Sequence, residues 1–196
     1  MDDKEFFDKL APTWDDNEIL STPEKVREII NMIDLKEGDE VLDLGTGTGV
    51  LLPFIAEKIG ESGKITAVDY SKEMLKRAMD KFSDLTPAPL FLNLDIENDT
   101  IPGDYDTIIL YCVYPHLHEP LETLKWLSKV NLKPDGSIVI AFPCDNNFIN
   151  NIHKEKHSSS DKLPSPATLS EFFIKGGLKA KVVSDTKKSY VIIINK

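Results

Sequence analysis

Short apolar runs alternate with stretches of helical periodicity along most of the chain. Runs of four to eight Val, Ile and Leu residues between turn residues are typical of buried strands, whereas apolar residues every three or four positions are typical of amphipathic helices. We expect strands at 40–44, 64–69, 90–94, 105–111 and 137–142. Helical patterns at 50–59, 71–82 and 120–130 separate most of them, and Ser71 is the expected N-cap of the second. This alternation predicts a parallel α/β sheet with helices on both faces.

The pattern changes after residue 166. A helix at 167–175 ends at Gly176-Gly177, and two further strands at 178–184 and 189–194 are separated by a short polar turn, which predicts an antiparallel hairpin. The whole chain is then one domain, residues 1–196, with a Rossmann-like, seven-stranded, mostly parallel sheet. A sheet completed by an antiparallel hairpin differs from the six-stranded dinucleotide-binding fold.

Two stretches lie outside this pattern. Residues 1–33 contain aromatic residues followed by a helical pattern at 23–33, and residues 143–166 are polar, so we expect an N-terminal helical lid and an irregular insertion on the substrate side. Phe6, Phe7 and Trp14 either close over an acceptor or serve as hydrophobic staples for the N-terminal helix.

The strongest motif is a glycine-rich turn, Val-Leu-Asp-Leu-Gly-Thr-Gly-Thr-Gly at 41–49, between a strand and a helix. Glycines let the backbone approach a ligand, and the following helix N-terminus offers free N–H groups to a carboxylate. Asp43 is placed to face an ammonium group. A dinucleotide-binding motif needs a glycine at position 50, which is Val50 here, so a pyrophosphate ligand is disfavoured. The predicted ligand contacts in this turn are Asp43, Gly45, Thr46, Gly47 and Gly49.

Carboxylates also end the second and third predicted strands. Asp69 lies where an acidic side chain accepts hydrogen bonds from ribose hydroxyls, and Tyr70 either lies against an adenine or is an exposed loop residue. Asp95 and Ile96 suit an adenine amino group and an apolar wall, although Asp95 also suits a capping role.

With these residues the chain resembles the class I SAM-dependent methyltransferases, in particular the ubiquinone/menaquinone-biosynthesis type. The resemblance spans roughly residues 5–142 and includes Phe-Phe-Asp-x-x-Ala-x-x-Trp-Asp at 6–15, the turn at 41–49, Asp-Tyr-Ser-Lys-Glu-Met-Leu from Asp69, Asp95, Tyr-Asp-Thr-Ile-Ile from Tyr105, and Leu-Lys-Pro-Asp-Gly-Ser from Leu132. It implies S-adenosyl-L-methionine (SAM) lying across the strand ends and methyl transfer to an acceptor beneath the lid. Asp135 replaces a commoner glycine, and Asp tolerates turn conformations.

The composition of the chain limits the class of methyl acceptor and the cellular compartment that we expect. A formal net charge of −10 disfavours nucleic acid, because non-specific nucleic-acid affinity comes from basic patches. No apolar run approaches the roughly 20 residues of a membrane span. The acidic start lacks the order of a secretory signal, so we expect a cytoplasmic protein with Cys112 and Cys144 as free thiols. The expected partner is a small-molecule acceptor, and the oligomeric state is not indicated.

The acceptor side is expected at the end of the fourth predicted strand. His116 is the leading candidate for a general base and Tyr111 for an acceptor contact, whereas His118 either contributes or opens the next helix. No metal site is predicted. A soft-ligand site for a metal or a thiol-reactive acceptor stays open as an alternative, from His116, Cys112, Cys144, and from His153 and His157, which are spaced four apart.

Three functions remain after these observations. The first is a SAM-dependent methyltransferase that acts on a small molecule. The alternatives are a non-catalytic SAM-binding regulatory module, and an NAD-dependent oxidoreductase, which Val50 and the terminal hairpin disfavour.

Overall fold

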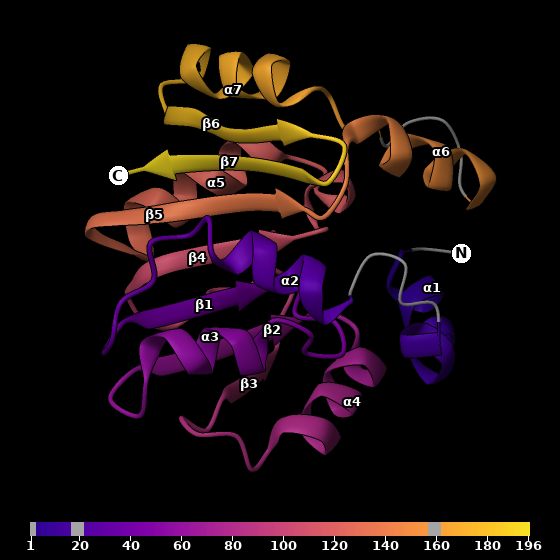
Figure 1. Cartoon of the computed structure of the whole chain (residues 1–196), viewed down its shortest axis with the longest axis vertical. Helices are drawn as coiled ribbons and strands as arrows, with labels where there is room; N and C mark the ends of the chain where they lie inside the picture. The colour runs from indigo at the N-terminus through magenta and orange to yellow at the C-terminus, as the bar shows by residue number, and fades with distance from the viewer. Residues whose placement is uncertain (1–2, 17–21, 157–161) are drawn as a thin grey trace.

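A computed structural model describes residues 3–16, 22–156 and 162–196 (Figure 1). Within these residues, seven strands form one sheet in the order β3-β2-β1-β4-β5-β7-β6. The first five strands pair in parallel, and β7 is antiparallel to both β5 and β6. The predicted seven-stranded sheet with its terminal hairpin is confirmed. The strands are β1 (Glu40–Leu44), β2 (Lys64–Asp69), β3 (Leu90–Asn93), β4 (Tyr105–Tyr111), β5 (Leu132–Phe142), β6 (Lys179–Thr186) and β7 (Ser189–Asn195).

Helices cover both faces of the sheet. One apolar cluster joins α2 and α3 to one face, and a second joins α5 and α7 to the other. Neighbouring residues of the central strands enter opposite clusters, as Val41 and Leu42 do, because successive side chains of a strand point to opposite faces. The helices are α1 (Asp3–Leu10), α2 (Pro23–Ile30), α3 (Leu52–Ile59), α4 (Lys72–Phe82), α5 (Pro120–Val130), α6 (Asn146–Lys156) and α7 (Pro166–Lys175), with short 3₁₀ turns η1 (Ala11–Asp16) and η2 (Tyr114–His116).

The strand order places a crevice beside β1. Because β2 and β4 lie on opposite sides of β1, the connections that follow β1 and β4 run to opposite faces of the sheet and leave a gap between them. Figure 1 shows α1 and α6 beyond the carboxyl ends of the parallel strands, on the same edge of the sheet as this gap. Within the described residues, no helix is long and apolar enough to cross a membrane.

The expectation of an irregular stretch at 143–166 is wrong in part, because Asn146–Lys156 forms α6. The Asp145 side chain accepts a hydrogen bond from the backbone N–H of Phe148 at 2.8 Å, and Ile149 is buried. An acidic N-cap before residues of helical spacing is a sufficient signal for a helix.

Two boundaries also differ from the prediction. The strand expected at 137–142 begins at Leu132, because Leu132 pairs with Tyr105 before an irregularity in the ladder. Asp135 has a φ of 65° in this irregularity, in agreement with a turn conformation. The expected helix at 23–33 ends at Ile30.

Adjacent phenylalanines on α7 provide a matched test of the core. Phe173 is 0% exposed, whereas Phe172 is 45% exposed. We expect Phe173→Ala to lower the free energy of unfolding by about 3–5 kcal/mol, since it leaves a cavity beside Tyr114. Phe172→Ala is expected to cost about 1 kcal/mol or less. Urea unfolding of both variants measures the difference, and equal losses would contradict this packing of α7.

Candidate functional site

The glycine-rich turn after β1 has three glycines in left-handed backbone conformations, Gly45, Gly47 and Gly49. A Cβ atom on Gly45 would lie 2.4 Å from Cγ2 of Val113, so close packing requires glycine there. At Gly47 an added Cβ would meet nothing within 4 Å. The turn therefore exposes bare backbone to open space, which is the geometry needed for close approach of a ligand.

Asp43, at the end of β1, is almost completely buried. Its Oδ2 accepts a hydrogen bond of 2.7 Å from the Thr46 hydroxyl. Burial raises the pKa of Asp43 to about 7, the nearby Asp69 carboxylate raises it further in the same direction, and the Thr46 hydrogen bond acts to lower it.

Asp69 ends β2 and connects two loops. Its two oxygens accept hydrogen bonds of 2.8 Å from the backbone N–H groups of Gly47 and Ser71. Burial raises the pKa of Asp69 to about 6, against the lowering effect of these two bonds. Of the residues that the structure describes, none forms a salt bridge with Asp43 or Asp69. Two buried carboxylates without a counter-charge favour the binding of a cationic ligand.

A compact turn, residues 95–99, follows β3, the strand that pairs with β2. The Asp95 carboxylate accepts hydrogen bonds from the backbone N–H of Glu97 at 3.0 Å and from the side-chain amide of Asn98 at 2.8 Å, and Ile96 packs against the core. Asn93 donates its side-chain amide to the carbonyls of Asp69 and Tyr70. Asn93 was not predicted as a site residue, because the sequence gives it no motif signal beyond its place at a strand end.

The N-terminal segment covers this edge of the sheet. The Phe7 ring lies between three other rings, with centroid distances of 5.6 Å to Trp14, 6.1 Å to Tyr70 and 5.1 Å to His116. This one side chain therefore contacts both the loop after β2 and the turn η2 after β4.

Two acidic residues attach the same segment to the site. Asp8 Oδ1 accepts a hydrogen bond of 2.6 Å from the Ser71 hydroxyl. Asp15 Oδ1 accepts one of 2.6 Å from the Thr48 hydroxyl, in the glycine-rich turn, and Asp15 pairs with Lys81 at 3.1 Å. Burial acts to raise the pKa of Asp15, but these partners together lower it, so it is ionised at neutral pH. The roles of these two carboxylates were not predicted from the sequence, although both belong to the motif at 6–15.

The three candidates for the acceptor side, His116, Tyr111 and His118, differ in their burial and contacts. His116 lies in η2 with its ring edge against Phe7. Tyr111 is 8% exposed and packs in the cluster under α2 and α3, and burial raises its pKa, so it is a poor proton donor or acceptor in this state. His118 contacts Glu97 at the start of α5.

Burial also raises the pKa of both thiols, to about 11 for Cys144, and thereby disfavours the thiolate that a soft metal needs. His157 lies outside the described residues, as does the side chain of His153. Among the side chains that the structure does place, no group of three or more His, Cys, Asp or Glu residues is arranged to hold a metal ion.

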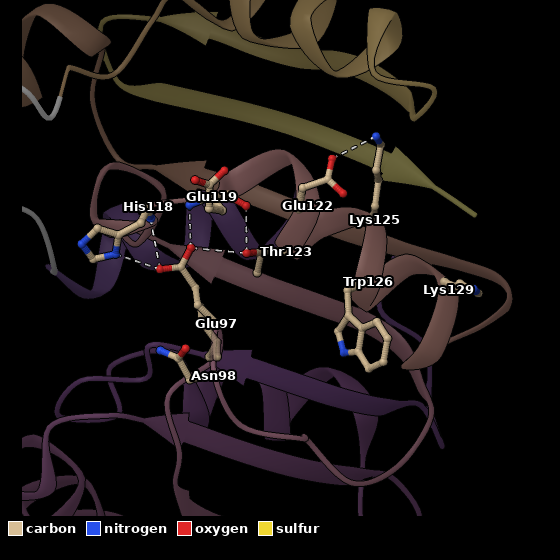
Figure 2. Close-up of a pocket in the computed structure, with 10 residues that line it drawn as sticks. Glu97, Asn98, His118, Glu119, Glu122, Thr123, Lys125, Trp126 and Lys129 are labelled. Carbon is tan, nitrogen blue, oxygen red and sulfur yellow. Dashed lines mark hydrogen bonds and ion pairs between the residues drawn. The ribbon is translucent and has the colours of Figure 1, made fainter.

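A groove of about 660 Å³ lies on the outer side of the 95–99 turn, between that turn and α5 (Figure 2). Glu97, His118, Thr123 and Trp126 are among its lining residues, and none of its lining residues comes from the glycine-rich turn.

The comparisons with known proteins point to one family. The family model described as "Methyltransferase domain" matches residues 35–190. A solved structure of a SAM-dependent methyltransferase from Aquifex aeolicus has a TM-score of 0.72, with 27% identity over 100% of this chain and 99% of its own. The chain belongs to the class I SAM-dependent methyltransferases.

Curated relatives of this methyltransferase carry different names. It is 31% identical to protein-L-isoaspartate O-methyltransferase 2 of Archaeoglobus fulgidus over 62% of the chain, and 30% identical to the ubiquinone/menaquinone biosynthesis C-methyltransferase UbiE of Geotalea uraniireducens over 70%. These alignments span only 53% and 61% of the two relatives. The family membership disfavours the oxidoreductase alternative and leaves the acceptor open.

The raised pKa values predict how the stability of the methyltransferase depends on pH. Between about pH 4 and pH 7 the folded protein holds protons on Asp43 and Asp69 that the unfolded chain has released, because an ordinary Asp pKa is about 3.9. The free energy of unfolding without SAM should therefore fall as the pH rises through this window. Asp43→Asn removes one of these protonations, so it should raise the free energy of unfolding by about 2–3 kcal/mol more at pH 8 than at pH 5.

Urea unfolding of the ligand-free protein at the two pH values measures this effect. Asp84→Asn, at an exposed site, is the matched control and should leave the pH dependence unchanged. An Asp43→Asn variant with the same pH dependence as the parent would contradict the protonation of Asp43.

Proposed function

We propose that the protein transfers the methyl group of SAM to a small-molecule acceptor at the carboxyl edge of the sheet. The observation that carries this proposal is the pair of buried, uncompensated carboxylates, Asp43 and Asp69, on either side of a glycine turn with open space at Gly47. A ligand with a positive charge and sugar hydroxyls satisfies both carboxylates at once.

The donor groups fit SAM from one end to the other. Asp43, Gly45, Thr46, Gly47 and Gly49 are assigned to its methionine end, where a buried carboxylate suits the ammonium group and bare backbone suits the carboxylate. Asp69 is assigned to the ribose, since a carboxylate has about four lone-pair positions and the backbone of Gly47 and Ser71 uses two.

The adenine is assigned to the loops that follow β2 and β3. There Tyr70 and Ile96 supply apolar surface and Asp95 supplies an acceptor, in addition to its role in shaping the 95–99 turn.

When bound, SAM supplies an electrophilic methyl group on a sulfonium. The chain's own part is mainly to position the acceptor in line with that methyl group and to exclude water. Phe7 and Trp14 form the apolar cover for both tasks. His116, beside Phe7, is assigned to accept a proton when the acceptor is a hydroxyl or a protonated nitrogen, because histidine is the side chain that most often acts as a general base.

A small acceptor agrees with the shape and charge of this edge. The N-terminal segment lies over it with aromatic side chains, and a net charge of −10 disfavours a nucleic acid. The names of the curated relatives cover both a protein residue and a quinone pathway, so the acceptor proposal rests on this chain alone.

Calorimetric titration with S-adenosylhomocysteine (SAH), the demethylated product, tests the cofactor site. Asp69→Asn should weaken SAH binding by at least about tenfold, because it removes a charged acceptor worth roughly 1.4 kcal/mol or more. His116→Ala is the control and should keep the affinity within about threefold. NAD should not bind, and NAD binding in place of SAH would refute the proposal. Unchanged affinity in Asp69→Asn would remove Asp69 from the site.

The N-terminal segment, residues 3–16, is proposed to be a lid that slows release of the cofactor. Asp15→Ala removes its attachment to Thr48 and Lys81, so SAH should dissociate about five times faster or more, in line with about 1 kcal/mol for a partly exposed pair. Asp16→Ala, at the exposed neighbouring position, should not change the rate.

Stopped-flow fluorescence provides the measurement. The chain has two tryptophans, so Trp126→Phe leaves Trp14, in ring contact with Phe7, as the sole reporter. Equal dissociation rates in Asp15→Ala and Asp16→Ala would show that the segment does not retain the cofactor.

A further inference from the structure

The Glu97 carboxylate joins two loops that are about twenty residues apart in the sequence. It accepts hydrogen bonds from the backbone N–H groups of His118 at 3.1 Å and Glu119 at 2.8 Å. The same carboxylate contacts His118 Nδ1 at 3.0 Å and the Thr123 hydroxyl at 3.4 Å. Figure 2 shows Glu97 reaching from its own turn to the first residues of α5.

This carboxylate serves as the N-terminal cap of α5. Glu119, the N-cap residue, makes no capping hydrogen bond with its own side chain. The Glu97 side chain lies at that helix end instead and is only 15% exposed. Burial alone would raise the pKa of Glu97, but the bonds from Glu119 and His118 lower it, so the group is ionised and favourably placed at the positive end of the helix.

Both ends of this connection lie next to assigned site residues. Glu97 directly follows Ile96, the assigned adenine wall, and its backbone N–H is bound to Asp95. His118 and Glu119 follow η2, which contains His116. Glu97 therefore provides a direct hydrogen-bonded connection from the 95–99 turn to the start of α5 and to the turn before it.

We propose that Glu97 is a positioning residue that couples occupation of the adenine site to the placement of His116. The inference rests on the proposed cofactor site and adds a connection between its two ends. Glu97 touches neither cofactor nor acceptor in this scheme, and it acts through the backbone that it holds.

Adenosine is the probe, because it carries the adenine and ribose but lacks both the methionine end, which is assigned to the glycine-rich turn, and the methyl group. The readout is the NMR signal of the His116 ring, which is sensitive to its position relative to the Phe7 ring at 5.1 Å. In the parent protein, saturating adenosine should shift this signal. In Glu97→Ala, adenosine should bind within about threefold of the parent affinity, but the shift should be lost.

Glu97→Gln keeps one acceptor oxygen and should retain part of the shift, which gives a second variant if Glu97→Ala does not fold. Glu122→Ala is the matched control, because this carboxylate lines the same groove, is 68% exposed and pairs with Lys125. Its adenosine response should equal that of the parent. Hydrogen exchange of the His118 and Glu119 amides should accelerate in Glu97→Ala and not in the control.

Two outcomes would overturn the coupling. The first is that the His116 signal of the parent protein does not change when adenosine binds. The second is that the Glu97→Ala variant keeps the full shift. This second outcome would assign the coupling to the ring contacts between Tyr70, Phe7 and His116 instead. If SAH binds and adenosine does not, the same comparison of parent and variant is made with SAH. Failure of both ligands to bind would refute the proposed cofactor site, an outcome distinct from loss of the coupling alone.

Discussion

The geometry of the crevice depends on the hydrogen bonds that the Asp69 carboxylate accepts. This carboxylate accepts a backbone hydrogen bond from Gly47 on one side and from Ser71 on the other, so one buried group fixes the turn after β1 and the start of α4 together. A buried carboxylate is costly unless several donors surround it, which is why both loops converge on its position. Ser71 then caps α4 by accepting the Met74 N–H, and its hydroxyl donates to Asp8 in the N-terminal segment. The cofactor edge and its cover are thus parts of one polar network.

The sheet topology explains why this network lies where it does. The reversal of strand order at β1 opens the crevice, and the glycine-rich turn leaves bare backbone next to open space at Gly47. On the opposite side of the crevice, η2 after β4 places His116 against Phe7. Family membership agrees with this arrangement, and a shared fold does not by itself determine the acceptor.

The strands, the terminal hairpin and most helices could be predicted from the sequence because burial on both faces leaves continuous apolar runs, and because turns such as Gly176-Gly177 have unambiguous chemistry. The places of Asp43, Asp69 and Asp95 at strand ends were predictable for the same reason. The contacts of Asp8, Asp15 and Glu97 were not, since each joins segments that are distant in the sequence. The helix after Asp145 was missed because its polar composition outweighed a short apolar spacing. Tyr111 illustrates the converse case, in which a strand-end residue belongs to the core.

The ionic attachment of the N-terminal segment makes the ionic strength of the solution a variable for this protein. Asp15 and its partners Arg77 and Lys81 have side chains that are between a third and two-fifths exposed, so dissolved ions screen their attraction over about 10 Å at 0.1 M salt and about 3 Å at 1 M. Under the proposed lid role, molar salt should weaken the attachment of Asp15, so a bound cofactor should dissociate faster than it does in dilute buffer. Cofactor affinities of different variants are therefore comparable only when they are measured at one salt concentration.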